Sequence, residues 1–220
     1  MDIPRKIFSH WEPPYPEGME KTINEVRAHN PEFEYILYSD AMCRDFIKDN
    51  FDSSVIEAYD SFVPDAYKSD LWRYCMLYTY GGIYLDIKFK PMNGFKFLTL
   101  LNSEYYVKDR PEHFQHGFGI YSGLLVCRPR NDIMLKCIEK VVKNAKDRVY
   151  GYNPLYPTGP GVVSEFVPKD TKIDLTFNGN SIEYNGKIIL ETYDDYRLEQ
   201  QLFGTLHYDT AWRSKGIYRE

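Results

Sequence analysis

An alternation of strand-like and helix-like segments in the first half of this 220-residue chain constrains its fold more than any other feature. Residues 6–11 and 33–38 are short apolar-rich runs that predict strands. Each is followed by apolar residues at helical spacing, first at 17–30 and then in a helix capped by Asp40. This order predicts a layered α/β fold with a largely parallel sheet.

The rest of the chain continues the pattern and offers no boundary between domains. Residues 63–80 predict the strongest helix, and Gly81-Gly82 provides its stop. Further segments predict strands at 83–89, 119–127, 182–184 and 188–190 and a helix at 132–146. Because no linker or internal repeat is present, we expect one domain over residues 1–220, with a Rossmann-like, mostly parallel central sheet flanked by helices.

Charge and composition exclude several classes of protein. The formal net charge is −5 without a block of basic residues, so the electrostatic footprint of a nucleic-acid-binding protein is missing. No apolar run is long enough for a membrane span or a signal peptide, so we expect a cytoplasmic protein. We also expect a monomer. The cysteines are widely spaced and predict reduced thiols, not a zinc site: Cys43, Cys75, Cys127 and Cys137.

The segment from Ala66 to Lys88 carries the most chemical information. On a helix, Asp70 and Arg73 share a face and form either a surface ion pair or a polar clamp aimed into a cleft. The Gly-Gly break then places the helix end beside a strand whose exit carries Asp86. Ligands of open α/β sheets bind at the carboxyl ends of strands, where a carboxylate meets a diphosphate, a ribose or a cation.

This segment resembles the S-D-x-x-R-Y…Y-G-G-x-Y-x-D-x-D signature of the DXD-containing sugar transferases. They are a retaining GT-A glycosyltransferase family that includes yeast-type mannosyltransferases and capsular-polysaccharide-synthesis proteins. Residues 3–11 are similar to the family's I-P-K-x-I-H-x-x-W start, 158–161 to its T-G-P turn and 207–212 to its terminal H-x-x-x-x-W. The four matches occur in family order, and the resemblance implies a GT-A fold and hexosyltransferase activity.

The resemblance also implies roles for individual residues. It implies that the following bind the donor: Phe8, Trp11, Asp70, Arg73, Leu85, Asp86, His207 and Trp212. Trp11 would lie near the donor base and Trp212 would close over the leaving group, whereas Asp70 and Arg73 would hold the sugar or phosphate. Without the family context, Trp11 fits core packing equally well and His207 fits a structural histidine.

The candidate catalytic residues are Asp70, Arg73, Asp86 and Lys88. We expect Arg73→Ala and Asp86→Ala to abolish transfer and to leave the fold intact. Lys88 departs from the family, because it occupies the position of the second aspartate of the D-x-D pair, normally a direct metal ligand. Residues two apart on a strand point to the same side, so Lys88 should face the same cleft as Asp86.

The lysine leaves two possibilities for the cofactor. Asp86 and His207, together with diphosphate oxygens, would hold Mn²⁺ or Mg²⁺. Alternatively, Lys88 replaces part of the metal's charge, because an ammonium has no lone pair for a cation but neutralises a diphosphate directly.

The expected reaction moves a hexose or deoxyhexose from a nucleotide-diphospho-sugar, with UDP-sugar favoured over GDP-sugar, to a glycan, glycoprotein or polysaccharide acceptor. The resemblance implies retention of anomeric configuration. An alternative is a catalytically weak nucleotide-sugar or glycan-binding module on the same fold. A glycoside hydrolase would need two carboxylates flanking the scissile bond, and no motif places Glu104 and Asp109, or Asp194 and Asp195, in that arrangement.

Overall fold

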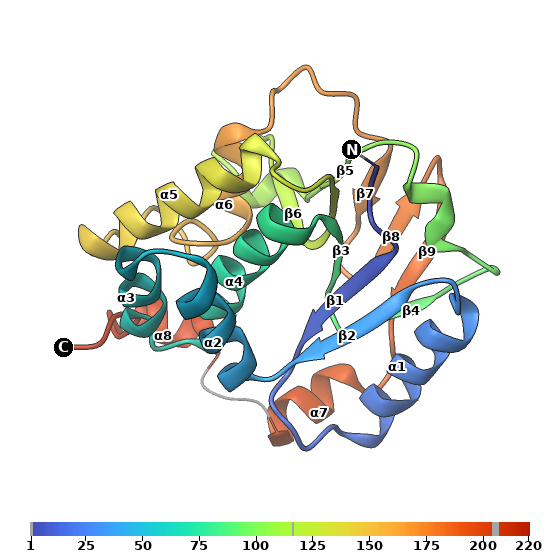
Figure 1. Cartoon of the computed structure of the whole chain (residues 1–220), viewed down its shortest axis with the longest axis horizontal. Coiled ribbons are helices and arrows are strands. Elements are labelled where there is room, and N and C mark those ends of the chain that lie inside the picture. Colours follow the sequence, from blue (N-terminus) through green and yellow to red (C-terminus); the bar gives the residue numbers. More distant parts are fainter. Residues whose placement is uncertain (1, 116, 204–206) are drawn as a thin grey trace.

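A large twisted sheet forms the centre of the fold in the computed structural model, which describes residues 2–115, 117–203 and 207–220 (Figure 1). Within these residues the sheet has nine strands in the order β2-β1-β3-β6-β5-β7-β8-β9-β4. Their bounds are β1 Lys6–His10, β2 Glu34–Tyr38, β3 Gly82–Leu85, β4 Phe89–Pro91, β5 Tyr105–Lys108, β6 Ile120–Cys127, β7 Leu175–Phe177, β8 Ser181–Tyr184 and β9 Lys187–Thr192.

The sheet is mixed, which corrects the prediction of a mostly parallel sheet. The strand pairs β1-β2, β1-β3 and β5-β7 are parallel. The pairs β3-β6, β4-β9, β5-β6, β7-β8 and β8-β9 are antiparallel. Part of the reason is visible at Asn185 and Gly186, where both residues have positive φ and join β8 to β9 through a tight turn. Such a turn forms an antiparallel hairpin without a crossover helix.

Helices lie on both sides of the sheet. Their bounds are α1 Glu17–His29, α2 Asp40–Asn50, α3 Ser53–Ser61, α4 Asp65–Tyr80, α5 Asp132–Lys146, α6 Pro160–Phe166, α7 Tyr196–Phe203 and α8 Tyr208–Arg213, with 3₁₀ turns at Phe97–Leu100 and Pro111–His113. In Figure 1 the helices α2 to α6 and α8 gather to the left of the sheet, whereas α1 and α7 lie at the lower right. Ser39, not Asp40, caps α2, since its side chain accepts the Met42 N–H.

Helix α4 is the centre of the larger apolar cluster, and its position sets that of β3. Its residues 69–77 are buried. The helix ends at Gly81, where φ is 63° and a Cβ atom would lie 2.5 Å from the Pro129 nitrogen. Gly82 follows with φ of 98° and begins β3. Two left-handed residues therefore turn the chain from helix to strand without a loop, and only glycine adopts this backbone readily.

The structure also bears on the strand predicted at 83–89 and on the four cysteines. Strand β3 ends at Leu85 and β4 begins at Phe89, so the predicted strand at 83–89 is broken by a turn in which the Phe89 N–H donates to the Asp86 carbonyl. The four cysteines are free and buried. In the part of the chain described above, every helix is too short or too polar to cross a membrane.

Candidate functional site

A cavity of about 790 Å³ opens where β1 and β3 reach their carboxyl ends. Its walls come from α4, from the turn after β3, from β6 and from α7 and the start of α8. Six of the residues predicted from the sequence line it together: Trp11, Asp70, Arg73, Asp86, Lys88 and His207. These side chains therefore come from three segments that lie far apart in the sequence: Trp11, the segment from Asp70 to Lys88, and His207.

Three of the predicted donor-binding residues lie outside the lining of this cavity. Phe8 is 1% exposed and belongs to the larger apolar cluster, whereas Leu85 is buried in the cluster that contains β5 and β7 residues. Trp212 packs at the edge of the larger cluster, and its indole N–H donates to the Tyr150 carbonyl at 2.8 Å. These side chains support neighbouring elements, and their placement gives no support to direct contact with a donor.

Asp70 is held by the turn that follows α5. The Thr158 hydroxyl donates to its Oδ2 at 2.7 Å, and an Arg73 nitrogen lies 3.2 Å from Oδ1. A Cβ atom at Gly159 would lie 2.8 Å from Oδ2, so a larger residue there would displace the carboxylate. Burial raises the pKa of Asp70, and the Arg73 charge and the Thr158 hydrogen bond oppose that rise. The T-G-P turn thus positions the carboxylate.

Arg73 is 7% exposed and lies between two carboxylates. Its Nη1 donates to the Ser122 carbonyl at 2.8 Å and lies 3.8 Å from Asp86 Oδ1. The Ser69 hydroxyl accepts from Nη2 at 3.2 Å, and the guanidinium carbon lies 4.1 Å from the centre of the Tyr84 ring. Hydrogen bonds along its edge and a ring on its face hold the guanidinium in one orientation.

Asp86 receives hydrogen bonds on both carboxylate oxygens. The Tyr84 hydroxyl donates to Oδ1 and the Tyr121 hydroxyl to Oδ2, each at 2.9 Å. Burial alone would raise the pKa of Asp86, but the charges of Lys88 and Arg73 and the two tyrosine hydrogen bonds outweigh it and lower the pKa to about 2. Asp86 is therefore ionised at every ordinary pH.

Lys88 faces Asp86, although for a reason different from the predicted one. The chain turns after β3, and this turn brings the Lys88 ammonium to 3.2 Å from Asp86 Oδ2. The ammonium also lies 5.3 to 5.7 Å from the ring centres of Phe89, Tyr121 and Tyr196. Its side chain is 18% exposed, so the charge is sheltered but borders the cavity.

The predicted metal ligands do not fit a divalent cation. An ammonium lies beside Asp86, whose two oxygens already accept hydrogen bonds. His207 is exposed, and its Nδ1 accepts the Asp209 N–H at 3.3 Å. Among the described residues no group of three histidine, cysteine or acidic side chains is arranged to hold a metal ion. The family's usual oxygen ligand set is therefore absent from this part of the chain.

Sequence reasoning missed the two tyrosines that donate to Asp86. Tyr84 could have been found, because it lies two residues before Asp86 at the end of a strand and belongs to the same motif. Tyr121 comes from β6 and carries no local signal. Pairing of β3 with β6 brings its hydroxyl to the carboxylate.

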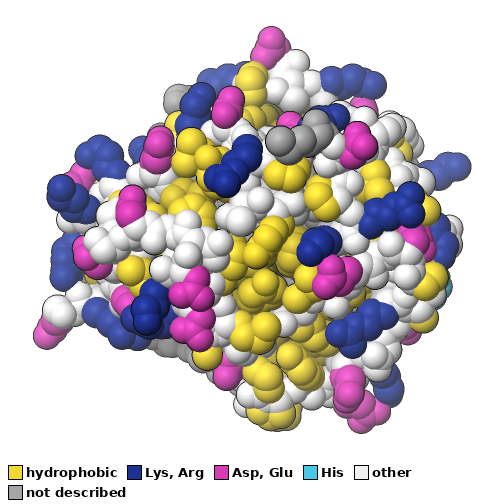
Figure 2. Space-filling view, in the orientation of Figure 1, with side chains coloured by type: hydrophobic (Ala, Val, Ile, Leu, Met, Phe, Trp, Pro, Cys, Tyr) yellow, Lys and Arg dark blue, Asp and Glu magenta, His cyan; other side chains and the backbone are white. Residues whose placement is uncertain are grey.

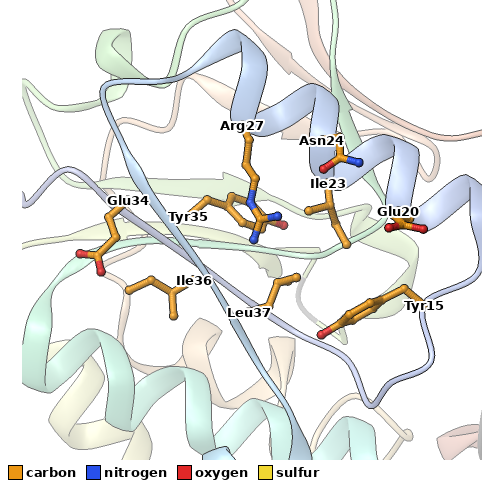
Figure 3. A pocket seen from close by; sticks show the side chains of 9 residues that line it. All are labelled: Tyr15, Glu20, Ile23, Asn24, Arg27, Glu34, Tyr35, Ile36 and Leu37. Atoms are coloured by element: carbon orange, nitrogen blue, oxygen red, sulfur yellow. The ribbon is translucent and has the colours of Figure 1, made fainter.

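A second hollow, of about 460 Å³, lies between α1 and β2 (Figure 3). In Figure 3 the Arg27 side chain reaches from α1 toward the Tyr35 ring on β2, and its guanidinium lies 5.3 Å from the ring centre. None of the residues predicted to be functional lines this hollow. The larger cavity is therefore the candidate site.

The fold is similar to that of a known glycosyltransferase. The PaToxG glycosyltransferase matches 74% of this chain and 68% of its own, with a TM-score of 0.56 and 17% sequence identity. Residues 16–107 match the family described as the glycosyltransferase sugar-binding region containing the DXD motif. This match confirms the resemblance inferred from the sequence, and residues 16–107 are the part of the chain that is similar to that family's sugar-binding region.

Individual relatives agree with this assignment. Inositol phosphoceramide mannosyltransferase 2 of Schizosaccharomyces pombe is 26% identical over 214 residues, which are 96% of this chain and 59% of that protein. Inositol phosphoceramide mannosyltransferase 3 of the same yeast is 35% identical over 89 residues, 39% of this chain and 24% of that protein. Uncharacterized glycosyltransferase L373 of Acanthamoeba polyphaga mimivirus is 33% identical over 92 residues, 39% and 35% of the two chains. The chain thus spans less than two thirds of each relative's length.

Proposed function

We propose that this chain transfers mannose from a nucleoside-diphosphate mannose to an acceptor hydroxyl. One observation carries the proposal: Trp11 lines the same cavity as the charged cluster Asp70, Arg73, Asp86 and Lys88. The names of the yeast relatives support mannose as the sugar. Because mannose is carried as GDP-mannose, we propose a guanine nucleotide, in place of the UDP-sugar favoured from the sequence.

Each side chain has a role in the proposed reaction. The Trp11 ring stacks on the base, and Asp86 accepts hydrogen bonds from the ribose. Asp70 orients the sugar through its hydroxyls, while Arg73 and Lys88 stabilise the negative charge that develops on the departing diphosphate. In a retaining transfer with front-face attack, the leaving phosphate accepts the proton of the acceptor hydroxyl, so no separate base is required.

The acceptor in this proposal is a polyol carried by a lipid, of the kind that appears in the yeast relatives' names. Helix α7 supports this choice, because it exposes Leu198, Leu202 and Phe203, and Phe203 also lines the cavity. Figure 2 shows apolar side chains at the lower edge of this face, where α7 lies in Figure 1. A lipid headgroup could enter the cavity beside this apolar surface.

Calorimetric titration of GDP, GDP-mannose, UDP and UDP-glucose into the purified chain tests the donor. We expect the guanine nucleotides to bind more tightly. Transfer is then measured from radiolabelled GDP-mannose to inositol phosphoceramide in detergent. Loss of guanine nucleotide binding in Asp86→Asn, with the fold retained by circular dichroism, would support the site.

A binding module without turnover is the second candidate function, and the lysine in place of the motif's second aspartate favours it. It predicts that GDP-mannose binds but that neither mannose transfer nor release of free mannose is detected. Binding of uridine nucleotides alone, or of no nucleotide, would contradict the proposed donor.

A further inference from the structure

We infer that the Lys88 ammonium takes the place of the divalent cation in this site, so that the chain binds a nucleoside diphosphate without a metal. The inference rests on the proposed function and adds to it the means by which the diphosphate charge is neutralised. Three observations on Lys88 carry it: its position, its hydrogen-bonding capacity and its effect on the neighbouring carboxylate.

The position of Lys88 is fixed by the backbone on both sides. Its carbonyl accepts the Tyr193 N–H at 3.1 Å, and the next residue begins β4, which pairs with β9. The side chain therefore leaves a rigid turn at the carboxyl end of β3 and enters the cavity. This is the edge of an α/β sheet at which phosphate-bearing ligands bind.

The ammonium retains hydrogen-bonding capacity for a ligand. It carries three N–H donors, of which Asp86 Oδ2 can accept one at 3.2 Å. The rings of Tyr121 and Tyr196 lie beside it and contribute no anionic oxygen. Diphosphate oxygens in the cavity can accept the remaining donors, and such charge-assisted hydrogen bonds are among the stronger ones in proteins.

The same ammonium makes Asp86 a poor metal ligand. A divalent cation bound to Asp86 would lie close to a fixed positive charge in a sheltered part of the cavity and would be repelled by it. It would also compete with the hydroxyls of Tyr84 and Tyr121 for the two oxygens. The lysine thus supplies a positive charge and disfavours a cation at this carboxylate.

The test is calorimetric titration of GDP into the full chain, once with EDTA and once with 1 mM MnCl₂. For the wild type we expect dissociation constants that agree within about twofold in the two buffers. Lys88→Ala should weaken binding in EDTA by about 10- to 100-fold, since it removes charged hydrogen bonds. Lys88→Arg keeps the charge and should bind within about fivefold of the wild type in EDTA.

Lys88→Asp restores the family's pair of carboxylates and should bind GDP only with Mn²⁺, because hard cations favour oxygen ligands. Lys90→Ala is the matched control. Lys90 lies two residues further on, pairs with Asp194 at 3.9 Å and does not line the cavity. The Lys90→Ala variant should therefore bind GDP with the same dissociation constant as the wild type.

Two results would overturn the inference and leave the proposed function standing: wild-type binding of GDP that requires Mn²⁺, or a folded Lys88→Ala variant with unchanged affinity in EDTA. Failure of the wild type to bind GDP in either buffer would overturn both proposals. If Lys88→Ala does not fold, the inference is still tested by the GDP affinities of the wild type in the two buffers and of Lys88→Arg in EDTA.

Discussion

The Asp86 carboxylate accepts hydrogen bonds from two tyrosine hydroxyls and lies within 4 Å of the charged groups of Arg73 and Lys88. Asp70, Arg73, Asp86 and Lys88 alternate in sign, and each lies within 4 Å of the next. Removal of one member leaves its neighbours in a sheltered site with less compensating charge. Substitutions in this site therefore change stability as well as ligand binding.

The pH dependence of stability tests the environment of Asp86. Burial alone would raise the pKa of Asp86 above its ordinary value of 3.8. The charges of Lys88 and Arg73 and the tyrosine hydrogen bonds outweigh burial and lower this pKa to about 2. The ionised carboxylate therefore stabilises the fold above about pH 4 by about 2 kcal/mol, and this contribution is lost as the pH falls toward 2.

We expect the free energies of unfolding of the wild type and Asp86→Asn, measured with urea, to differ most at pH 5 and to converge toward pH 2.5. The Asp194 side chain is 91% exposed, so Asp194→Asn serves as the control. Its free energy of unfolding should differ little from that of the wild type at either pH. A difference for Asp86→Asn that is the same at both pH values would contradict the described environment.

The contacts of Arg73 predict that Arg73→Ala destabilises the protein, which differs from the expectation of an intact fold drawn from the sequence. The substitution leaves Asp70 buried without its positive partner, and it leaves the Ser122 carbonyl without its donor. Breaking a buried pair in this way destabilises a protein by about 3–5 kcal/mol.

Thermal and urea unfolding should show this loss for Arg73→Ala. Arg44→Ala removes the same side chain from an exposed pair with Asp60 and should change the melting temperature little. Equal melting temperatures for the two variants would show that Arg73 is not needed for the fold.

At the scale of elements, the junction between α4 and β3 determines where the site lies. Gly81 has φ of 63° and ψ of −163°, a region that other residues avoid at a cost of about 1–3 kcal/mol. A Cβ atom there would also lie 2.5 Å from the Pro129 nitrogen. Gly81→Ala should therefore destabilise the protein by more than the backbone term alone and should weaken GDP binding.

Gly94→Ala separates these two effects. Gly94 also has positive φ, 69°, but nothing lies within 4 Å of the position of its Cβ atom. The difference between the two variants in urea unfolding measures the contact with Pro129. If Gly94→Ala is as destabilising as Gly81→Ala, the close approach has no effect.

At the scale of the whole molecule, α7 forms one wall of the cavity and contacts α1 near the other end of the chain. Glu199 accepts the Gly18 N–H of α1 at 2.8 Å and the Tyr193 hydroxyl at 2.6 Å. Tyr196 and Arg197 of the same helix line the cavity. Glu199 therefore joins α7 to the start of α1.

Hydrogen–deuterium exchange tests this coupling. Glu199→Ala should make the amides of α7 exchange about tenfold faster, since it removes a hydrogen bond to a charged group, and should weaken GDP binding. Leu198 lies on the same helix and is 57% exposed, so Leu198→Ala should leave amide exchange in α7 and GDP binding unchanged. Unchanged exchange in Glu199→Ala would show that other contacts hold the helix.

The sequence alone determined what depends on neighbours along the chain. Helices α1, α4 and α5 lie within two residues of their predicted bounds, because apolar spacing and stop signals are local. The motif around Asp70 and Asp86 was equally visible, and the match over residues 16–107 agrees with it. Local patterns therefore predicted the layered fold, the resemblance to the sugar transferases and the segment that contains the site.

Only the tertiary structure decided which segments meet. The antiparallel pairing of β3 with β6 made the sheet mixed and brought Tyr121 to Asp86. The turn after Leu85 set Lys88 against Asp86, while packing placed Phe8 and Trp212 away from the cavity. Strand order and side-chain direction depend on contacts between residues far apart in sequence, and periodicity within a segment carries no information about its partner.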